Sequence, residues 1–310
     1  MSGGTARQVI EELGFDKEVQ QLQDILGEWT ARADDEMQSA LRWQFQAGSK
    51  YFRPLTIFSC YRALYQGPMP PPLVRSAAVL EMFHNVSLII DDIVDGSPTR
   101  RGVPTLHNQF GTLPALMTSG YIVADGYRLI AHDPHDIRLL SELLMRLGVA
   151  ECMQWRLRRK PLGVEDWRRI AGEDTGSMFE VCACLGTRTE ELRRFGHLLG
   201  VLYHGCDDVG DVRGALALGG GGDEDIRDGI LTLPAALAIR HPEVAATFVD
   251  PNPGAEDLTM LSRAFTAQIP EAERYLDLLA DEAREEARRW AANPDPLVAL
   301  VDHTRRLSSR

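Results

Sequence analysis

The chain has 310 residues, of which 44% are hydrophobic and 25% are charged, a composition typical of a folded globular protein with a large apolar core. A formal net charge of −12 argues against nucleic acid as a partner and repels polyanionic ligands unless cations mediate their binding. The N-terminal residues lack the apolar core of a signal peptide, and no apolar run approaches the roughly 20 residues of a membrane span. We therefore expect a cytoplasmic protein that has no membrane span.

Apolar residues recur at three- and four-residue spacing along most of the chain, and this periodicity predicts amphipathic helices. The clearest such segments span residues 18–45, 73–90, 137–157 and 272–290. Clusters rich in Gly, Pro and Asp separate them at 65–72, 95–99, 132–136, 219–225 and 250–254, and these are too short to be domain linkers. No alternating run of strand length stands out. We therefore expect an all-α protein of about ten helices that forms a single domain over residues 1–310.

Carboxylates rather than cysteines offer the candidate metal site. The five cysteines lack the paired spacing of zinc or redox sites and are expected to be reduced, buried thiols. Directly after an apolar run, Asp91 and Asp95 stand four residues apart, so on a helix they share one face, with Asp92 beside them. This pattern suits Mg²⁺, which takes one or two carboxylates and completes its coordination with water and phosphate oxygens.

A second copy of the pattern is formed by Asp207, Asp208 and Asp211, again after a mostly apolar segment. One copy could arise by chance, but two copies in one chain favour a metal site. Six carboxylates brought together would repel one another without cations. We therefore expect Mg²⁺ and a polyphosphate ligand as their partners.

The two aspartate motifs and the motifs around them resemble those of the trans-isoprenyl diphosphate synthases, the polyprenyl synthetase family. The first motif, in its context "EMFHNVSLIIDDIVDGSPTRRGVPTLHNQFG", is most similar to geranylgeranyl diphosphate synthases. In addition, "GSKYFRP" is similar to the family's GGKxxRP, "EDTGSMF" to its KTGxLF and "DIRDGILTLP" to its DLxxGKxTxP. The resemblance covers about residues 40 to 240. It implies an all-α helical bundle with a central apolar cavity, and a homodimer.

By this resemblance, the protein condenses an allylic prenyl diphosphate with isopentenyl diphosphate, head to tail. The allylic diphosphate ionises, the double bond of isopentenyl diphosphate attacks the carbocation, and proton loss leaves a chain five carbons longer. Mg²⁺ ions held by all six aspartates would stabilise the departing diphosphate, and a dry cavity would protect the cation from water. The resemblance places isopentenyl diphosphate at Lys50, Arg53, His84 and Arg101, and the allylic diphosphate at Arg100.

Product length is also implied by the resemblance. In family members the residue five positions before the first aspartate helps to set the floor of the chain pocket, and an aromatic residue there stops growth early. This position is Val86 here, with Ser87 beside it, so we expect geranylgeranyl diphosphate or a longer product, about C20 or more. Phe83, nearly a turn deeper, would be the residue responsible if the product were shorter.

The sequence departs from the family at positions that grip the allylic diphosphate. Asp174 and Ile230 replace two family lysines, His204 replaces the glutamine before the second aspartate motif, and Tyr51 stands where a basic residue is common. Arg227 would partly compensate if it shared a helix face with Ile230. The sequence alone predicts that lysine at 174 or at 230 strengthens the hold on the allylic substrate.

These departures leave two alternatives to chain elongation. The first is a terpene cyclase, or a prenyltransferase with another acceptor, on the same fold. The second is a catalytically weak regulatory subunit of a heteromeric synthase. The complete set of isopentenyl-binding residues favours elongation, and the two intact aspartate motifs argue against a regulatory subunit.

Overall fold

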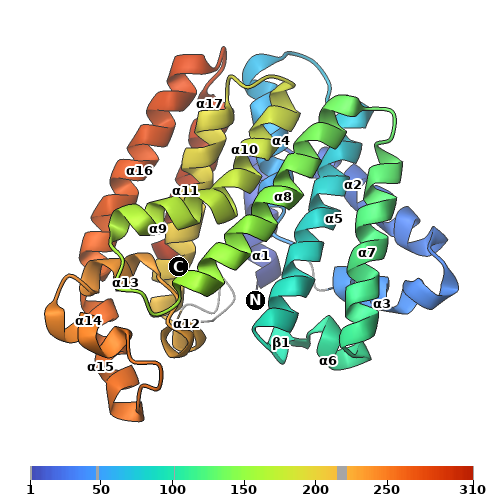
Figure 1. The fold of residues 1–310 in the computed structure, drawn as a ribbon. Coiled ribbons are helices and arrows are strands. Elements are labelled where there is room, and N and C mark those ends of the chain that lie inside the picture. The colour runs from blue at the N-terminus through green and yellow to red at the C-terminus, as the bar shows by residue number, and fades with distance from the viewer. Residues whose placement is uncertain (1, 47–48, 101, 215–221, 310) are drawn as a thin grey trace. The chain divides into compact units, whose positions relative to one another are not determined.

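Helices make up almost all of the fold, and the prediction of an all-α protein is confirmed (Figure 1). The computed structural model describes residues 2–46, 49–100, 102–214 and 222–309. Contacts within the chain divide it into two compact units, each described by itself below. Unit 1 comprises Met1–Leu144 and Cys184–Glu190, and unit 2 comprises Met145–Ala183 and Glu191–Arg310. That the whole chain forms a single domain remains a prediction.

Unit 1 is built around helix α5, Pro71–Val94, which packs against α2, α4 and α7. Two prolines occupy the first helical positions of α5, where their missing N–H groups cost nothing. Almost every residue from Leu73 to Val86 is buried, because α5 is apolar on all sides. The remaining elements of this unit are α1 Ser2–Leu13, α2 Asp16–Arg32, α3 Asp35–Gln46, α4 Phe52–Leu64, β1 Thr99–Arg100, β2 Val103–Pro104, α6 Leu106–Phe110, α7 Thr112–Leu129 and the first part of α8 Pro134–Leu157.

The apolar composition of α5 also meets the length and hydropathy expected of a membrane span. However, 78% of its most apolar 18-residue window is buried inside the fold. A buried core helix of a soluble protein has the same composition. The position of α5 therefore accounts for its hydropathy without a membrane.

Helix α5 ends where the first aspartate motif ends. Asp95 donates its backbone N–H to Asp91 at 2.9 Å and closes the last turn, and Gly96 then adopts the left-handed conformation, with φ +63°. The chain turns into the two-residue antiparallel pair β1–β2 before α6 begins. This short excursion, in an otherwise helical protein, returns Arg100 to the end of α5.

Unit 2 is organised around α11, Arg193–Val212, which lies beside α16, Ile269–Trp290 (Figure 1). Among the other elements that α11 packs against are the short π-helix η1, Gly172–Gly176, the helix α17, Asp295–Arg305, and the 3-10 helix η2, Arg306–Ser309. The remaining elements of the unit are the second part of α8, α9 Val164–Ala171, η1 Gly172–Gly176, α10 Ser177–Thr187, which ends in unit 1, α12 Gly222–Asp228, α13 Leu233–Ala238, α14 Pro242–Phe248, α15 Ala255–Ala267, α17 Asp295–Arg305 and η2 Arg306–Ser309.

The contact between α11 and η1 is made by backbone. A Cβ atom on Gly200 would lie 2.7 Å from Gly176 Cα and 2.8 Å from Thr175 O, so only glycine allows this approach. Single-turn π-helices inside helices are rare and occur frequently at functional sites. The two glycines bring the η1 residues Asp174 and Thr175 to the face of α11 that carries the second aspartate motif.

The described residues form more helices than the ten or so that the sequence predicts, since the α-helices run from α1 to α17. The periodic segment 18–45 is interrupted at Ala33, whose extended backbone, with ψ 159°, separates α2 from α3. Several of the additional helices, including α6, α12, α13 and α14, have only five to seven residues. Such short elements carry too few apolar repeats to be distinguished from connections.

Candidate active site

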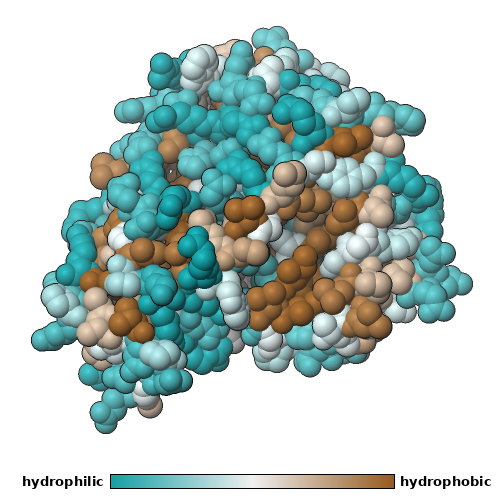
Figure 2. All heavy atoms as spheres, viewed as in Figure 1, coloured by the Kyte–Doolittle hydropathy of each residue, from teal (hydrophilic) through white to brown (hydrophobic). Residues whose placement is uncertain are grey.

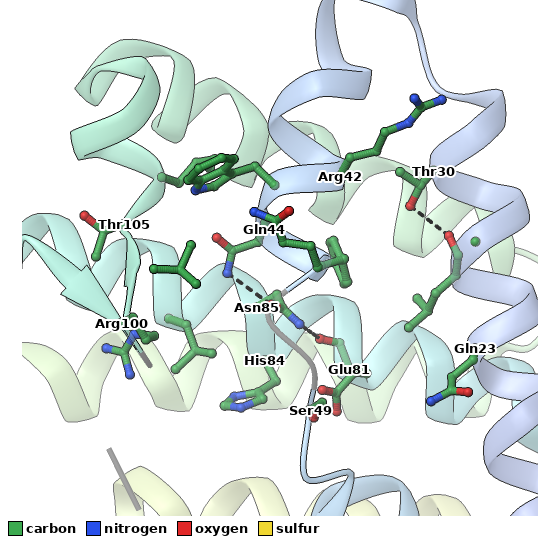
Figure 3. Close-up of a pocket in the computed structure, with 18 of the residues that line it drawn as sticks. Gln23, Thr30, Arg42, Gln44, Ser49, Glu81, His84, Asn85, Arg100 and Thr105 are labelled. Carbon is green, nitrogen blue, oxygen red and sulfur yellow. Dashed lines mark hydrogen bonds between the residues drawn. The ribbon is translucent and has the colours of Figure 1, made fainter. Parts of the chain in front are cut away.

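A cavity of about 380 Å³ lies in unit 1 between α2, α3, α5 and the β1–β2 pair. Figure 3 shows His84 and Asn85 of α5 in this cavity, with Gln44 of α3 and Arg100 of β1. Gln44 donates to the side-chain oxygen of Asn85 at 3.1 Å and so joins the α3 and α5 walls. Asp92 lines the cavity as well. Cationic and polar groups therefore surround the end of α5 that carries the first aspartate motif.

Two of the residues predicted to bind isopentenyl diphosphate are in direct contact. Arg53, on the first turn of α4, lies with Nη1 3.1 Å from Nε2 of His84. Because a guanidinium has only donors, His84 Nε2 accepts this hydrogen bond. Lys50 is half-buried and stands between Ser49 and Tyr51, which both line the cavity. Arg101, the fourth predicted residue, lies outside the described residues.

The residues of the first aspartate motif occupy different environments. Asp92 is only 3% exposed, and Arg100 Nε donates to its Oδ1 at 2.8 Å. Burial raises the pKa of Asp92 above its ordinary value, while the charge of Arg100 opposes the rise. Asp91 is half-buried and Asp95 is exposed. Arg100, predicted to contact the allylic diphosphate, therefore also holds the middle aspartate in place.

The three residues predicted to control product length lie earlier on α5. Phe83 is fully buried and meets Tyr127 of α7 edge to face, with ring centroids 5.1 Å apart. A Cβ on Gly126 would lie 2.5 Å from the Phe83 ring, so α7 is close-packed against it. Val86 is buried and Ser87 half-buried. They are positioned between Phe83 and Asp91, as the sequence spacing predicts.

In the second aspartate motif, the middle residue is again the buried one. Asp208 Oδ2 accepts hydrogen bonds from the indole N–H of Trp167 at 2.7 Å and from the backbone N–H of Leu233 at 2.8 Å. Burial raises the pKa of Asp208, whereas the charge of His204 and these two donors lower it. Asp207 and Asp211 are half-buried. Asp92 and Asp208 thus both serve as acceptors for groups of the protein.

Two of the departures from the family pattern meet in the structure. His204 Nδ1 lies 3.3 Å from Asp174 Oδ2 and 2.9 Å from Thr175 Oγ1. The Thr175 hydroxyl donates to Asp174 at 3.1 Å, so its oxygen accepts from His204 and Nδ1 carries the hydrogen. His204 Nε2 is 3.7 Å from Asp208 Oδ1. Asp174 and His204 are thirty residues apart in the sequence, and nothing in their spacing predicts this contact.

The electrostatic setting of His204 follows from these contacts. Burial alone would lower the pKa of His204, but the charge of Asp208 and the hydrogen bond to Asp174 raise it to about 9. The imidazole is therefore a cation at neutral pH. It supplies positive charge beside the second motif, where the family's glutamine supplies none.

Asp225 is a further acidic residue of the second site that the sequence reasoning did not single out. Its pKa is raised well above the ordinary value, first by burial and then by the charges of the second motif's three aspartates. Asp225 is on α12 and accepts the backbone N–H of Ile230 through its carbonyl at 2.9 Å. Asp225 is the first residue of the segment "DIRDGILTLP", which resembles the family motif DLxxGKxTxP. Its place in that motif is the feature of the sequence that could have identified it as a site residue.

Arg227 does not share a helix face with Ile230. Helix α12 ends at Asp228, and Gly229 leaves it with φ +70°. The Arg227 side chain is paired with Asp228 at 3.0 Å, and its carbonyl accepts from Arg159. The predicted compensation by Arg227 through a common helix face is wrong, because the helix stops before it reaches Ile230.

The donor chemistry of the two aspartate motifs fits a hard divalent cation, which prefers carboxylate oxygens. The mutual repulsion that raises the pKa of Asp225 is what such a cation would relieve. Among the described residues, the tightest acidic group is a different one, Asp133, His135 and Asp136, whose ligand atoms lie within 4.8 Å. Arg188 bridges both of its aspartates, at 2.8 and 3.4 Å, and lowers the pKa of Asp133. A guanidinium therefore already balances that group.

Comparison with known proteins gives one consistent result. The family model described as polyprenyl synthetase matches residues 34–258. The chain is 29% identical over 296 residues to nonaprenyl diphosphate synthase of Mycobacterium tuberculosis, covering 88% of this chain and 87% of that protein. It is 26% identical over 223 residues to geranylgeranyl pyrophosphate synthase 4 of Arabidopsis thaliana, covering 64% and 59%.

Solved structures share the fold. Heptaprenyl diphosphate synthase from Staphylococcus aureus superposes with a TM-score of 0.85 at 19% identity, over 95% of this chain and 98% of that one. A polyprenyl synthase from Caulobacter crescentus, complexed with calcium and isoprenyl diphosphate, gives a TM-score of 0.86 at 21% identity, over 98% of both chains. The helical architecture of this chain is therefore that of prenyl synthases.

Proposed function

Because the chain belongs to the polyprenyl synthetase family, we propose that it is a trans-prenyltransferase that condenses an allylic prenyl diphosphate with isopentenyl diphosphate. The observation that carries this proposal is that His84, which Arg53 contacts, lines the same cavity as Asp92 and Arg100. Such a pocket presents donors to a diphosphate beside carboxylates suited to a cation. A cyclase acting on the allylic substrate alone has no use for this second set of donors.

We propose that the aspartates divide their work. Asp91, Asp95, Asp207 and Asp211 would hold divalent cations, which we take to be Mg²⁺, and when bound these cations neutralise the charge that develops on the departing diphosphate. Asp92 and Asp208, which the sequence also predicts to be metal ligands, would instead act as acceptors within the protein, since Arg100, Trp167 and Leu233 already donate to them.

The remaining residues bind and shield the substrates. Lys50, Arg53, His84 and Arg101 would bind isopentenyl diphosphate, and Arg100 the allylic diphosphate. Phe83, Val86 and Ser87 would line the growing chain, exclude water from the cation and allow a product of about C20 or longer.

Two further properties belong to the proposal. We propose a homodimer, supported by exposed apolar side chains on α7. We also propose a cytoplasmic location, supported by the burial of α5, the most membrane-like helix, inside the fold.

The test is incubation of the purified protein and Mg²⁺ with geranyl, farnesyl or geranylgeranyl diphosphate, each with and without isopentenyl diphosphate. We expect a product longer by five-carbon units, formed only when both substrates are present, abolished by EDTA and restored by Mg²⁺. Hydrocarbon or alcohol released from the allylic diphosphate alone would overturn elongation in favour of the cyclase. Turnover that appears only after addition of another synthase subunit would instead identify a regulatory chain.

A further inference from the structure

We propose that Asp174 and His204 form one positioning unit that replaces the lysine and glutamine of the family, so that neither position can be restored to the family residue alone. The unit holds the imidazole against Asp208 and thereby fixes the second aspartate motif. Its role in gripping the allylic diphosphate rests on the proposed function, whereas the coupling between the two residues does not.

The contacts on both sides of the imidazole support this inference. On one side, Asp174 Oδ2 and Thr175 Oγ1 both lie within 3.3 Å of Nδ1. On the other side, Nε2 points to Asp208, 3.7 Å away. Trp167 also flanks the ring, with centroids 6.2 Å apart, and itself donates to Asp208. The imidazole is thus held in one orientation between η1 and the motif.

The backbone around the pair fixes the distance between its members. Gly200 of α11 touches Gly176 and Thr175 of η1 without room for a Cβ. Arg146 also holds η1, since it donates to Glu173 at 3.1 Å. Asp174 therefore cannot withdraw from His204 by a simple shift of η1, and a new side chain at 174 must meet the imidazole.

Lysine at 174 alone would place a donor against a donor. Its ammonium would face Nδ1–H of His204 and the Thr175 hydroxyl, so the hydroxyl would lose its acceptor and the imidazole would lose the carboxylate beside Nδ1. Glutamine at 204 alone would remove the imidazole that lies between the carboxylates of Asp174 and Asp208 and put a neutral amide in its place. Lysine and glutamine together restore a donor and an acceptor. We therefore expect that lysine at 174 alone does not strengthen substrate binding, contrary to the expectation drawn from the sequence.

The coupling is tested by a double-mutant cycle in thermal unfolding, with neither metal nor substrate present. We expect Asp174→Lys and His204→Gln each to lower Tm by about 2–4 °C, and the double variant to lie within about 1 °C of the parent. Glu285→Lys, the same charge reversal at an exposed position of α16, is the matched control and should not change Tm. Asp174→Asn keeps an oxygen acceptor for Nδ1–H of His204 and should therefore lower Tm by less than Asp174→Lys does.

The positioning role is tested by steady-state kinetics on the same variants. We expect the KM for the allylic diphosphate to be about tenfold lower in the double variant than in Asp174→Lys, a ratio typical of one charge-assisted contact. The KM for isopentenyl diphosphate should stay within about twofold, as the residues proposed for it are unchanged.

Additive Tm losses in the double variant, or a gain in allylic binding from Asp174→Lys alone equal to that of the double variant, would overturn the proposal. Equal decreases in Tm for Asp174→Asn and Asp174→Lys would also overturn the proposal. If the parent protein elongates no allylic diphosphate, the proposed function fails, but the thermal cycle still decides whether the two residues are coupled.

Discussion

At the scale of single residues, the aspartates of each motif differ in what they touch. Asp208 accepts from Trp167 and Leu233, and Asp92 from Arg100. Asp91, Asp95, Asp207 and Asp211 are more exposed than these two. We therefore expect adjacent aspartates to have two different roles, holding a cation and accepting hydrogen bonds within the protein. Substituting them one at a time distinguishes these roles.

Asp207→Ala and Asp208→Ala should affect different properties: the first the reaction rate, the second the thermal stability. Asp207→Ala, like Asp91→Ala, is expected to reduce the rate by at least about a hundredfold with little change in Tm, since it removes a cation ligand. Asp208→Ala leaves a buried indole and a backbone N–H without acceptors and should lower Tm by about 5 °C or more. Assays of metal-dependent turnover alongside calorimetry test this division, and full activity of Asp207→Ala would contradict it.

Glu180 is a buried carboxylate of unit 2 that is surrounded by three cationic or basic side chains. Burial would raise its pKa, but His197 at 2.9 Å and Arg146 at 2.7 Å outweigh burial and lower the pKa to about 2. Arg193 is a third partner at 3.1 Å. Because the pKa is depressed on folding, this stabilisation is complete above the unfolded value of about 4.5 and is lost as pH falls toward 2.

We therefore expect Glu180→Gln to lower the free energy of unfolding by about 3 kcal/mol at pH 7 and to flatten its fall between pH 5 and pH 3. Urea unfolding at several pH values measures both effects. Glu285→Gln, which removes an exposed carboxylate, is the control. If the free energy of unfolding of Glu180→Gln falls with pH as it does in the parent protein, other carboxylates cause the loss of stability in acid.

At the scale of secondary structure, long helices were predictable and short ones were not. The apolar periodicity over 73–90 is strong because α5 is buried along most of its length. The apolar periodicity continues across the break at Ala33 and does not reveal it, whereas Asp34 before α3 and the acidic residues Asp35 and Glu36 in its first turn are local signals of a helix start. The same limit applies to the site. Motif spacing places Asp91 and Asp95 on one helix face, but it does not reveal that Asp174 meets His204.

Helix α5 also carries the residues expected to set product length. Val86→Phe should shorten the product by at least one five-carbon unit, since the ring fills space below Asp91, and it should cost about 1–3 kcal/mol of stability through overpacking. Chromatography of the dephosphorylated products measures the length. Val79→Phe, a similar enlargement seven residues earlier on the same helix, is the control and should not shorten the product to the same length. A C15 main product from the unmodified protein would point to Phe83 instead.

At the scale of the whole molecule, an apolar surface on unit 1 predicts association. Leu113, Leu116 and Met117 of α7 are 68%, 44% and 53% exposed, at the spacing of one helix face. Ile90 and Val94 of the adjacent α5 are also exposed. Figure 2 shows apolar side chains gathered over this part of the surface. Exposed apolar patches of this kind mark interfaces.

We expect light scattering to give twice the chain mass of 34.5 kDa and the double variant Leu113→Glu with Met117→Glu to give the monomer mass. Burying two carboxylates in an apolar interface is costly unless each is paired, so the variant should dissociate. Leu278→Glu, at an isolated apolar residue of α16 that is 64% exposed, is the control. A monomeric parent, or a dimer that survives both α7 substitutions, would contradict this prediction.

Phe83, Val86 and Asp91 all lie on helix α5, and this placement has a consequence for the proposed control of product length. Each helical turn advances about 5.4 Å, close to the extended length of one five-carbon unit. Moving a bulky side chain by one turn along α5 therefore moves the floor of the pocket by about one unit. In the proposed reaction, the distance along α5 from the carboxylates to a bulky side chain would therefore set the product length in five-carbon units. Substitutions at successive turns should change the product in discrete steps rather than gradually.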